Sequence, residues 1–469
     1  MPNHVKGKLV RFFVSVGVVL AGMSGMVAFA AQPHAETLEE ALSSAYRSNP
    51  TLLAKRAELR ATDEGIAKAR SGYRPSVSMQ GDVGRTHAQT KTRTGKGNDS
   101  FSPRGVSLTA VQPLYTGGRT EAEINAAESS VAAGRADLTA TEQGVMLDAV
   151  AAYLDVLRDV SEVELNTNNE RVVAKQLEAA RNRFEVGEVT RTDVAQAEAR
   201  LAQALADRVA AAGQLVASRS AYREVMGDLP GQLIWPEPAA RLPESEEAAR
   251  ELASKANPAI LLAEFSAQGA REQIDVARST LRPKLELRGD LSEGYDQSPL
   301  LERERGANIM AQVTIPLYQS GAEYSDIRRS KQVAGQRRLK LDRARRAVFN
   351  EVTQAWEALA TAQARGAALA AQIEASKAAL HGVQQEAEVG LRTTLDVLDA
   401  EQELFAAQVN AVRARRDEYV ASYRVKSSVG ELTAERLGLE VERYDVDVHY
   451  SRARDKWFGT EIDGEGETK

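Results

Sequence analysis

The chain contains an internal duplication, and this feature constrains its fold more than any other. Asn49-Pro50 recurs as Asn257-Pro258, 208 residues later, and Pro113-Leu114-Tyr115 recurs as Pro316-Leu317-Tyr318, 203 residues later. The segment around Val186-Gly187 also recurs 203 residues later. Because these residues mark turns and helix ends, and they recur in the same order, each half is expected to fold in the same way.

Each half is predicted to contain a helix, a strand, a loop, a strand, a long helix, a turn and a final helix. Helical periodicity covers 37–71, 119–186 and 190–228 in the first half and 244–280, 321–388 and 392–430 in the second. An early kink is expected at Asn49-Pro50. Polar and glycine-containing stretches at 87–104 and 293–305 are typical of exposed loops. Heptad spacing predicts coiled coils, and the shorter helices are expected to stack end to end along each long one.

The predicted strands have one apolar and one polar face. In the second half, leucines at 285, 287 and 291 alternate with charged residues at 286, 288 and 290. The strands at 77–83, 106–110 and 309–315 alternate similarly. Four such strands cannot enclose a channel alone, so several copies would have to share one barrel. Three copies would supply twelve strands, although the arithmetic permits other multiples.

Composition excludes several classes of protein. The chain has no cysteine, which excludes disulfides and thiolate metal sites. Only 5% of its residues are aromatic, whereas ordinary globular cores depend on aromatic side chains. The formal net charge of -6 gives no reason to expect nucleic acid as a partner.

The first thirty residues are predicted to be a cleaved signal peptide. A basic start is followed by an apolar run from Phe12 to Ala30, which ends in Ala28-Phe29-Ala30. An uncleaved membrane anchor is the alternative. After the signal peptide (1–30), the chain is divided into a first repeat (31–243), a second repeat (244–431) and a C-terminal segment (432–469).

Several motifs resemble the TolC family of outer membrane channel-tunnel proteins. They are the segments 183–194 and 389–400, the strand exits 112–115 and 315–318, and the tail 444–459. The resemblance implies a mainly α protein with a small membrane β part. It implies a homotrimer in which a twelve-stranded β-barrel is continued by a periplasmic tunnel of long coiled-coil helices. The C-terminal segment would then also lie in the periplasm.

The resemblance also implies function and partners. The chain would be an outer membrane exit duct of a Gram-negative bacterium, exporting proteins by type I secretion or small toxic molecules. Its partners would be a periplasmic adaptor, an inner membrane ABC or other exporter, and outer membrane lipid. A periplasmic adaptor and a coiled-coil scaffold are the alternatives. Two equivalent helical hairpins and Pro-bounded strands argue against both.

Two aspartates are candidates for a pore gate. Asp396 and Asp399 are three residues apart at the start of a predicted helix, where negative charge also complements the helix dipole. The resemblance assigns both to acidic rings at the narrowest point of the tunnel. Such rings select cations and bind multivalent ones.

A latch is expected beside this gate. By resemblance, Arg392 would link to Thr192 and Asp193 on a neighbouring hairpin, although an ordinary surface ion pair is the alternative. The family's tyrosine three residues before the turn glycine is replaced here by Ala387. The closed state would therefore be held by fewer or different links.

The hairpin turns are candidates for adaptor contact. Glycine after the last helical residue is typical of a helix C-terminus. By resemblance, these tips would also meet the adaptor through the residues Val186, Gly187, Thr190, Val389, Gly390 and Thr393. No catalytic, cofactor or metal site is predicted, because the five histidines lack ligand spacing and no catalytic constellation stands out.

Overall fold

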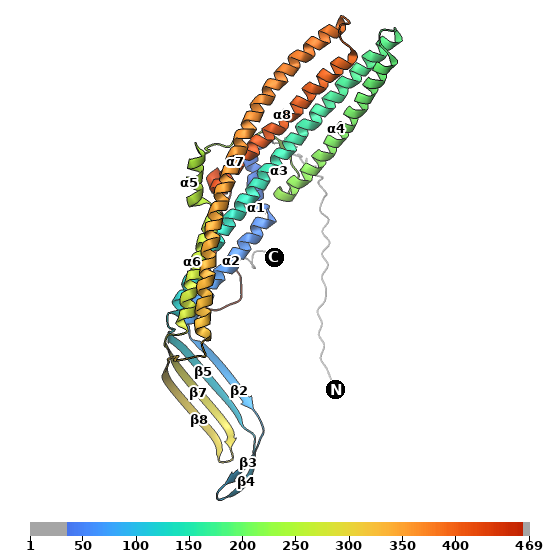
Figure 1. The fold of residues 1–469 in the computed structure, drawn as a ribbon. Coiled ribbons are helices and arrows are strands. Elements are labelled where there is room, and N and C mark those ends of the chain that lie inside the picture. Colours follow the sequence, from blue (N-terminus) through green and yellow to red (C-terminus); the bar gives the residue numbers. More distant parts are fainter. Residues whose placement is uncertain (1–34, 463–469) are drawn as a thin grey trace, which may run out of the picture.

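The computed structural model describes residues 35–462, so the predicted signal peptide lies outside the described residues. A sheet forms one end of an elongated molecule, and long helices form the rest (Figure 1). None of the described helices combines the length and apolarity needed to cross a lipid bilayer.

The two halves contain matching elements. In the first half they are α1 (Leu38–Ser48), α2 (Pro50–Arg70), β2 (Ser76–Val83), β3 (Thr86–Thr92), β4 (Gly95–Phe101), β5 (Arg104–Tyr115), α3 (Arg119–Glu185) and α4 (Arg191–Met226). In the second half they are α5 (Glu246–Ala256), α6 (Pro258–Ser279), β7 (Lys284–Ser298), β8 (Leu301–Thr314), α7 (Ala322–Glu388) and α8 (Thr394–Val429). The remaining short elements are β1 (Ala35–Glu36), β6 (Gln232–Leu233), a 3-10 turn (Ser71–Tyr73), α9 (Ala434–Leu437) and α10 (Val446–Asp455).

The helix lengths confirm the repeat. Both long helices have 67 residues, and both return helices, α4 and α8, have 36. Each long helix begins after a glycine in the left-handed conformation, Gly118 (φ 81°) and Gly321 (φ 84°). A residue with a Cβ is disfavoured there. The same turn chemistry therefore sets the start of both long helices.

Small residues allow the helices to approach closely. In α3 many of the buried positions are alanines, and α3 packs against α2, α4, α6 and α8. The largest apolar cluster lies near the middle of the molecule, where α1, α3 and the end of α4 meet the C-terminal segment. Tyr153 is fully buried in it and donates from its hydroxyl to the carbonyl of Ile234 at 2.7 Å. This hydrogen bond satisfies the polar end of an otherwise apolar residue.

The two Asn-Pro motifs join short helices end to end. Asn49 caps the N-terminus of α2, and its side-chain amide donates to the carbonyl of Val225 in the last turn of α4 at 3.0 Å. Asn257 caps α6 in the same way and donates to the carbonyl of Ser428 in α8 at 2.8 Å. Each asparagine therefore satisfies groups at a helix start and at a helix end that would otherwise lack partners.

The predicted stacking is only partly correct. The expected opening helices, 37–71 and 244–280, are each split, because Asn49 and Asn257 are extended (ψ 120° and 122°). The later pieces, α2 and α6, continue the columns beyond α4 and α8. Helix α1 also contacts the end of α4, because Ser44 and Ser48 donate to the carbonyl of Met226 at 3.3 and 2.9 Å. The earlier piece α5 lies beside the columns instead (Figure 1).

The main sheet has four antiparallel strands in the order β2-β5-β7-β8. Its register places apolar residues in rows across all four strands. One such row is Met79, Leu108, Leu291 and Ala307. The next row on the opposite face is polar, namely Ser78, Thr109, Asp290 and Asn308. The predicted division into one apolar and one polar face is therefore confirmed.

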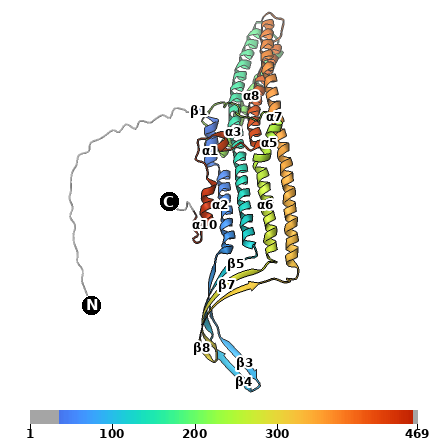
Figure 2. The ribbon, with the colours of Figure 1, turned by 90° about the vertical axis from the view of Figure 1, so that its left-hand side faces the viewer.

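The two predicted loops are wrong. Residues 87–104 form most of a second hairpin, β3–β4, which projects beyond the main sheet (Figure 2). Residues 293–305 continue β7 and β8 to a tight turn at 299–300. These strands are mostly exposed and polar on both faces, so they lack the alternation of apolar and polar residues by which a strand is predicted from sequence. Backbone pairing alone extends them.

The C-terminal segment lies along the first half. Helix α10 runs beside α2 (Figure 2). Its His449 lies 3.0 Å from the buried carboxylate of Asp63, and Asp455 pairs with Arg70 at 3.0 Å. Burial raises the pKa of Asp63. These contacts attach the end of the chain to the helical column that leads into the sheet.

Candidate functional site at the helical hairpin tips

Both hairpin tips turn through the same glycine motif. Gly187 (φ 81°) follows α3 and Gly390 (φ 80°) follows α7. In the first turn the amide of Glu188 donates to the carbonyl of Arg183 at 2.9 Å, and that of Gly187 donates to Phe184 at 3.0 Å. The second turn repeats both bonds. This pair of bonds defines a Schellman motif, which ends a helix by satisfying its last carbonyls.

The return helices begin with identical capping boxes. The Thr190 hydroxyl accepts from the amide of Asp193 at 3.3 Å, and the Asp193 carboxylate accepts from the amide of Thr190 at 2.8 Å. Thr393 and Asp396 make the same two bonds at the same distances. These hydrogen bonds give Thr190 and Thr393 a structural role as the N-caps of α4 and α8.

The tips expose apolar side chains beside these caps. Val186 and Val389 are each 72% exposed, and Leu391 is 76% exposed. A single exposed valine is ordinary, but equivalent ones at both tips give a repeated apolar surface at this end of the molecule. The predicted adaptor contact would use this surface, and it stays a prediction.

The two candidate gate aspartates have different surroundings. Hydrogen bonds from the backbone and then the side chain of Thr393 lower the pKa of Asp396, so it is ionised at neutral pH. Asp399 instead pairs with Arg200 of α4, with 2.7 Å between Oδ1 and Nη2. One carboxylate thus caps its own helix, and the other joins the two hairpins.

Sequence reasoning missed Arg200. The repeat offers a signal, because offset 203 aligns Arg200 with Glu403 and Gln196 with Asp399. At both positions the halves differ in charge. The acid at 399 and the cation at 200, each without a like-charged counterpart in the other half, form the ion pair between α4 and α8.

The expected latch does not form within one chain. Arg392 pairs with Glu386 on its own hairpin, with 2.9 Å between Nε and Oε2. Asp193 serves its capping box, and within residues 35–462 it makes no ion pair with Arg392. Thr192 is an exposed residue of the first turn of α4. A link from Arg392 to a neighbouring chain stays a prediction.

A buried carboxylate lies two residues beyond Asp399. Glu401 of α8 is only 8% exposed and accepts from the Gln176 amide of α3 at 3.0 Å. Burial raises the pKa of Glu401, and the amides of Gln176 and Gln384 offset part of that rise. Its counterpart in the first half, Glu198, has an arginine partner instead, Arg181 at 2.6 Å.

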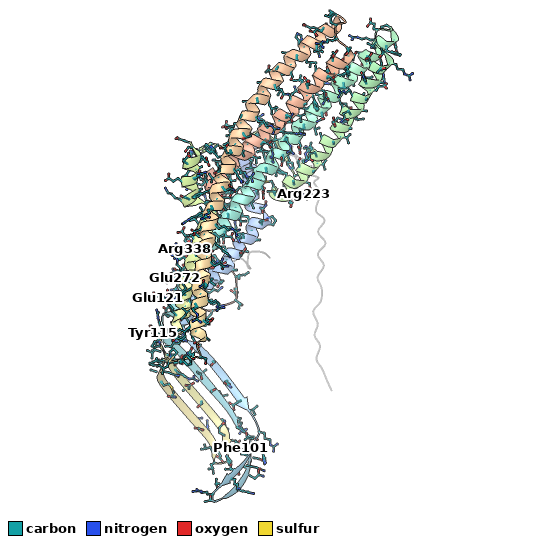
Figure 3. The ribbon with its side chains drawn as sticks, viewed as in Figure 1. Phe101, Tyr115, Glu121, Arg223, Glu272 and Arg338 are labelled. Carbon is teal, nitrogen blue, oxygen red and sulfur yellow. The ribbon has the colours of Figure 1, made fainter. Side chains whose placement is uncertain are left out.

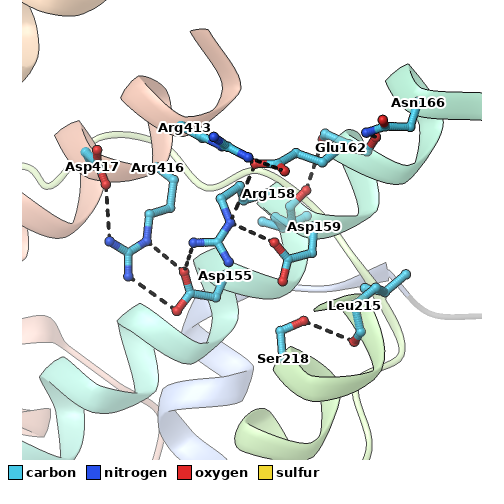
Figure 4. Close-up of polar contacts among 12 residues, drawn as sticks. Asp155, Arg158, Asp159, Glu162, Asn166, Leu215, Ser218, Arg413, Arg416 and Asp417 are labelled. Atoms are coloured by element: carbon cyan, nitrogen blue, oxygen red, sulfur yellow. Dashed lines mark hydrogen bonds and ion pairs between the residues drawn. The ribbon is translucent and has the colours of Figure 1, made fainter. Parts of the chain in front are cut away.

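Farther from the tips, a network of charges joins α3 to α8 (Figure 4). Arg413 holds Glu162 through two nitrogens at 2.8 and 3.0 Å. Arg416 pairs with Asp155 at 2.8 Å, and Arg158 pairs with the same aspartate at 2.7 Å. Because Glu162 is buried, removing one partner would leave an unpaired buried charge. The network therefore fixes α8 against α3 in the part of the columns between the tips and the sheet.

Comparison with known proteins decides the family. A sequence profile of the family described as outer membrane efflux protein matches residues 41–228 and 249–431. The chain belongs to the outer membrane efflux protein family. It is 36% identical over 458 residues to the outer membrane efflux protein BepC of Brucella suis, covering 96% of this chain and 97% of that protein. It is 28% identical to the outer membrane protein TolC of Vibrio cholerae, covering 91% and 96% of the two chains.

A solved structure agrees on the fold. The crystal structure of the outer membrane protein VceC of Vibrio cholerae matches with a TM-score of 0.72 and 18% identity, covering 84% of this chain and 96% of that one. The predicted family, outer membrane location and export function are thus confirmed. The alternatives of a periplasmic adaptor or a scaffold are not supported.

Proposed function

We propose that three copies of this chain form one export duct through the outer membrane and the periplasm. The observation that carries the proposal is the four-stranded sheet, whose apolar rows all lie on one face. Its edge strands, β2 and β8, have no outer strand partner among the described residues. In a bilayer such edges must be paired, and neighbouring copies would pair them.

Twelve strands would leave an open lumen. At about 4.8 Å between strands and a tilt of about 40°, they enclose a barrel roughly 25 Å wide. The inner face would carry the polar rows, including Asp290, which accepts from the Thr109 hydroxyl at 2.8 Å. The helical columns would extend this water-filled passage into the periplasm. The duct itself would need no enzymatic activity, cofactor or metal.

The tips would form the regulated end of the duct. Asp396 and Asp399 would form the cation-selective rings of the gate, and Arg392 would latch it to Thr192 and Asp193 of a neighbouring hairpin. A periplasmic adaptor would bind the exposed apolar tips around Val186 and Val389, which are both 72% exposed. An inner membrane exporter would deliver proteins or small toxic molecules to the assembly.

Cysteine labelling tests the orientation of the sheet, since the chain has no cysteine of its own. In outer membranes, Arg288→Cys and Gln312→Cys should react with a water-soluble maleimide, because they would face the lumen. Leu287→Cys and Val313→Cys should be protected by lipid. Preferential labelling at 287 and 313 would overturn the barrel. Export assays of a secreted protein and of a small toxic molecule would then separate the two kinds of cargo.

A further inference from the structure

The projecting hairpin β3–β4 is strongly basic. Residues 85–104 contain five cationic side chains and one acidic one, Asp99, whereas the whole chain has a net charge of -6. Within the described structure, four of these cations form no ion pair, namely Arg85, Lys91, Arg93 and Lys96. All four are exposed. This charge therefore stays available to a partner outside the chain.

The register places most of these cations on a single face. Gly84 donates to the carbonyl of Pro103 at 2.8 Å, so pairing continues from β2–β5 into β3–β4 without an inserted residue. Side chains alternate between faces along each strand. The face that carries Met79 in the main sheet thus continues as Arg85 and Lys91. Lys96 lies directly across from Lys91 on the same face.

The basic face begins where the membrane-spanning part of the sheet ends. Tyr115 lies at the end of the sheet near the helices, and its pairing with Leu285 places it on the apolar face (Figure 3). From Tyr115 back to Arg104 β5 has 12 residues, close to the ~10 that a tilted strand needs to cross the hydrocarbon layer. Aromatic side chains favour the membrane interface. The hairpin would therefore begin at the level of the outer lipid headgroups.

The chemistry of the face suits phosphate. Like charges directly across a strand pair destabilise it, so the Lys91 and Lys96 pair is unfavourable without an anion. Between these lysines and Arg85 the face carries polar side chains, namely Gln89, Asn98 and the hydrogen-bonded pair His87 and Ser100 at 2.8 Å. Lysine forms charge-assisted hydrogen bonds to phosphate, and the neighbouring amide and hydroxyl groups can donate further ones.

We propose that this basic face of β3–β4 binds the phosphate groups of outer-leaflet lipids around the channel. The inference rests on the proposed barrel, which sets the hairpin at the outer surface. Along one face of the protein the side chains change from apolar to cationic, just as the membrane changes from hydrocarbon to anionic headgroups. Lipid bound by the three hairpins would fix the depth of the channel in the membrane.

Native mass spectrometry of the purified full-length trimer tests the proposal. The probes are diphosphorylated lipid A, the same lipid without phosphates, and inorganic phosphate. The wild type should retain the diphosphorylated lipid best, and less of it as salt is raised. Lys91→Gln with Lys96→Gln should weaken its retention by roughly thirtyfold at low salt.

Two matched controls accompany this variant. Arg219→Gln with Arg223→Gln makes the same change in charge on α4, far from the sheet (Figure 3), and should bind like the wild type. Thr90→Gln with Thr92→Gln alters the other face of the same hairpin and should also bind normally.

The outcomes separate this inference from the proposed function. Equal retention by the lysine variant, or equal binding of inorganic phosphate and lipid by the wild type, would overturn the lipid site. If instead no variant and no wild-type protein inserts into bilayers as a trimer, the proposed duct itself fails.

Discussion

At the residue scale, two neighbouring carboxylates of one helical face serve different contacts. Asp396 is committed to the capping box with Thr393, and Asp399 to the ion pair with Arg200. The sequence carries a signal for the first contact, because a threonine followed three residues later by an acid is typical of a helix start. It does not predict the second, because a contact between two hairpins has no periodic signal. The burial of Glu401 cannot be predicted from the sequence for the same reason, since it depends on packing against α3.

We expect the acidic rings to control ion selectivity. Asp396→Ala with Asp399→Ala should weaken cation selectivity and block by trivalent cations in planar-bilayer recordings, because both rings lose their charge. Arg392→Ser is the separating variant, since it should raise conductance and keep selectivity. Unchanged selectivity and block in the double alanine variant would contradict the gate.

Arg200→Gln should have the opposite effect on selectivity. It frees Asp399 from its counter-ion, so trivalent cations should bind more tightly and cation selectivity should increase. Both partners are partly exposed, so the loss of stability should be only about 0–1 kcal/mol. The same recordings measure the effect. A fall in selectivity would show that Arg200 does not compensate Asp399.

Glu401 should make the packing of α8 against α3 sensitive to pH. Burial raises its pKa above the ordinary 4.5, so the folded state binds this proton more tightly than the unfolded chain. The contribution of Glu401 to the free energy of unfolding is therefore most favourable at low pH and is lost as the pH rises through the raised pKa. Glu401→Gln should raise the melting temperature by a few degrees at pH 8 and reduce its dependence on pH.

Glu198→Gln is the matched control for this prediction. Glu198 is the equivalent residue of the first half, but it is half-exposed and paired with Arg181. This variant should show no gain in melting temperature at pH 8. A similar gain in both variants would mean that the burial of Glu401 is not the cause.

At the scale of elements, the repeat and its turn residues predict most of the fold. The helix ends fall within about three residues of the expected positions because glycine, threonine and asparagine mark them. The strands at 86–101 and 293–305 were hidden by polar composition, since strand propensity depends on the surroundings more than on the residue. The Asn49-Pro50 motif predicts a break in the helix at this position. The direction of α1 after the break cannot be predicted, because it depends on packing against other helices.

The tip glycines should be needed for export but not for assembly. Gly187→Leu with Gly390→Leu strains a backbone with positive φ by roughly 1–2 kcal/mol at each site. A Cβ at either position would meet nothing within 4 Å, so the damage should stay in the turn. Trimers should reach the outer membrane, while export falls strongly. Heat-modifiable mobility and a secretion assay measure the two effects.

Gly213→Leu with Gly382→Leu is the control for the tip variant. These glycines lie within helices, and a Cβ there also meets nothing within 4 Å. The same increase in side-chain size should therefore leave export intact. Normal export by the tip variant would remove the adaptor contact from the proposal.

At the scale of the whole molecule, length itself is a functional property. Each 67-residue helix is about 100 Å long, which suits a duct that must reach far from the membrane. Both long helices are unbroken, whereas each parallel column is divided into two helices that meet near Asn49 or Asn257. The side-chain hydrogen bonds of these joints each contribute about 1 kcal/mol. Any change in hairpin angle should therefore occur at these joints rather than by bending the long helices.

The unequal hairpins of the sheet reduce the symmetry at the mouth. The repeat offset is 208 residues before the sheet and 203 after it. The segment from β2 to β5 is therefore five residues longer than the matching hairpin β7–β8. A trimer built from two near-identical halves approaches sixfold symmetry along its columns. At its outer rim, tall and short hairpins would alternate, and only threefold symmetry would remain. An antibody or phage fibre that recognises the tall hairpins would therefore find three equivalent sites on each channel, not six.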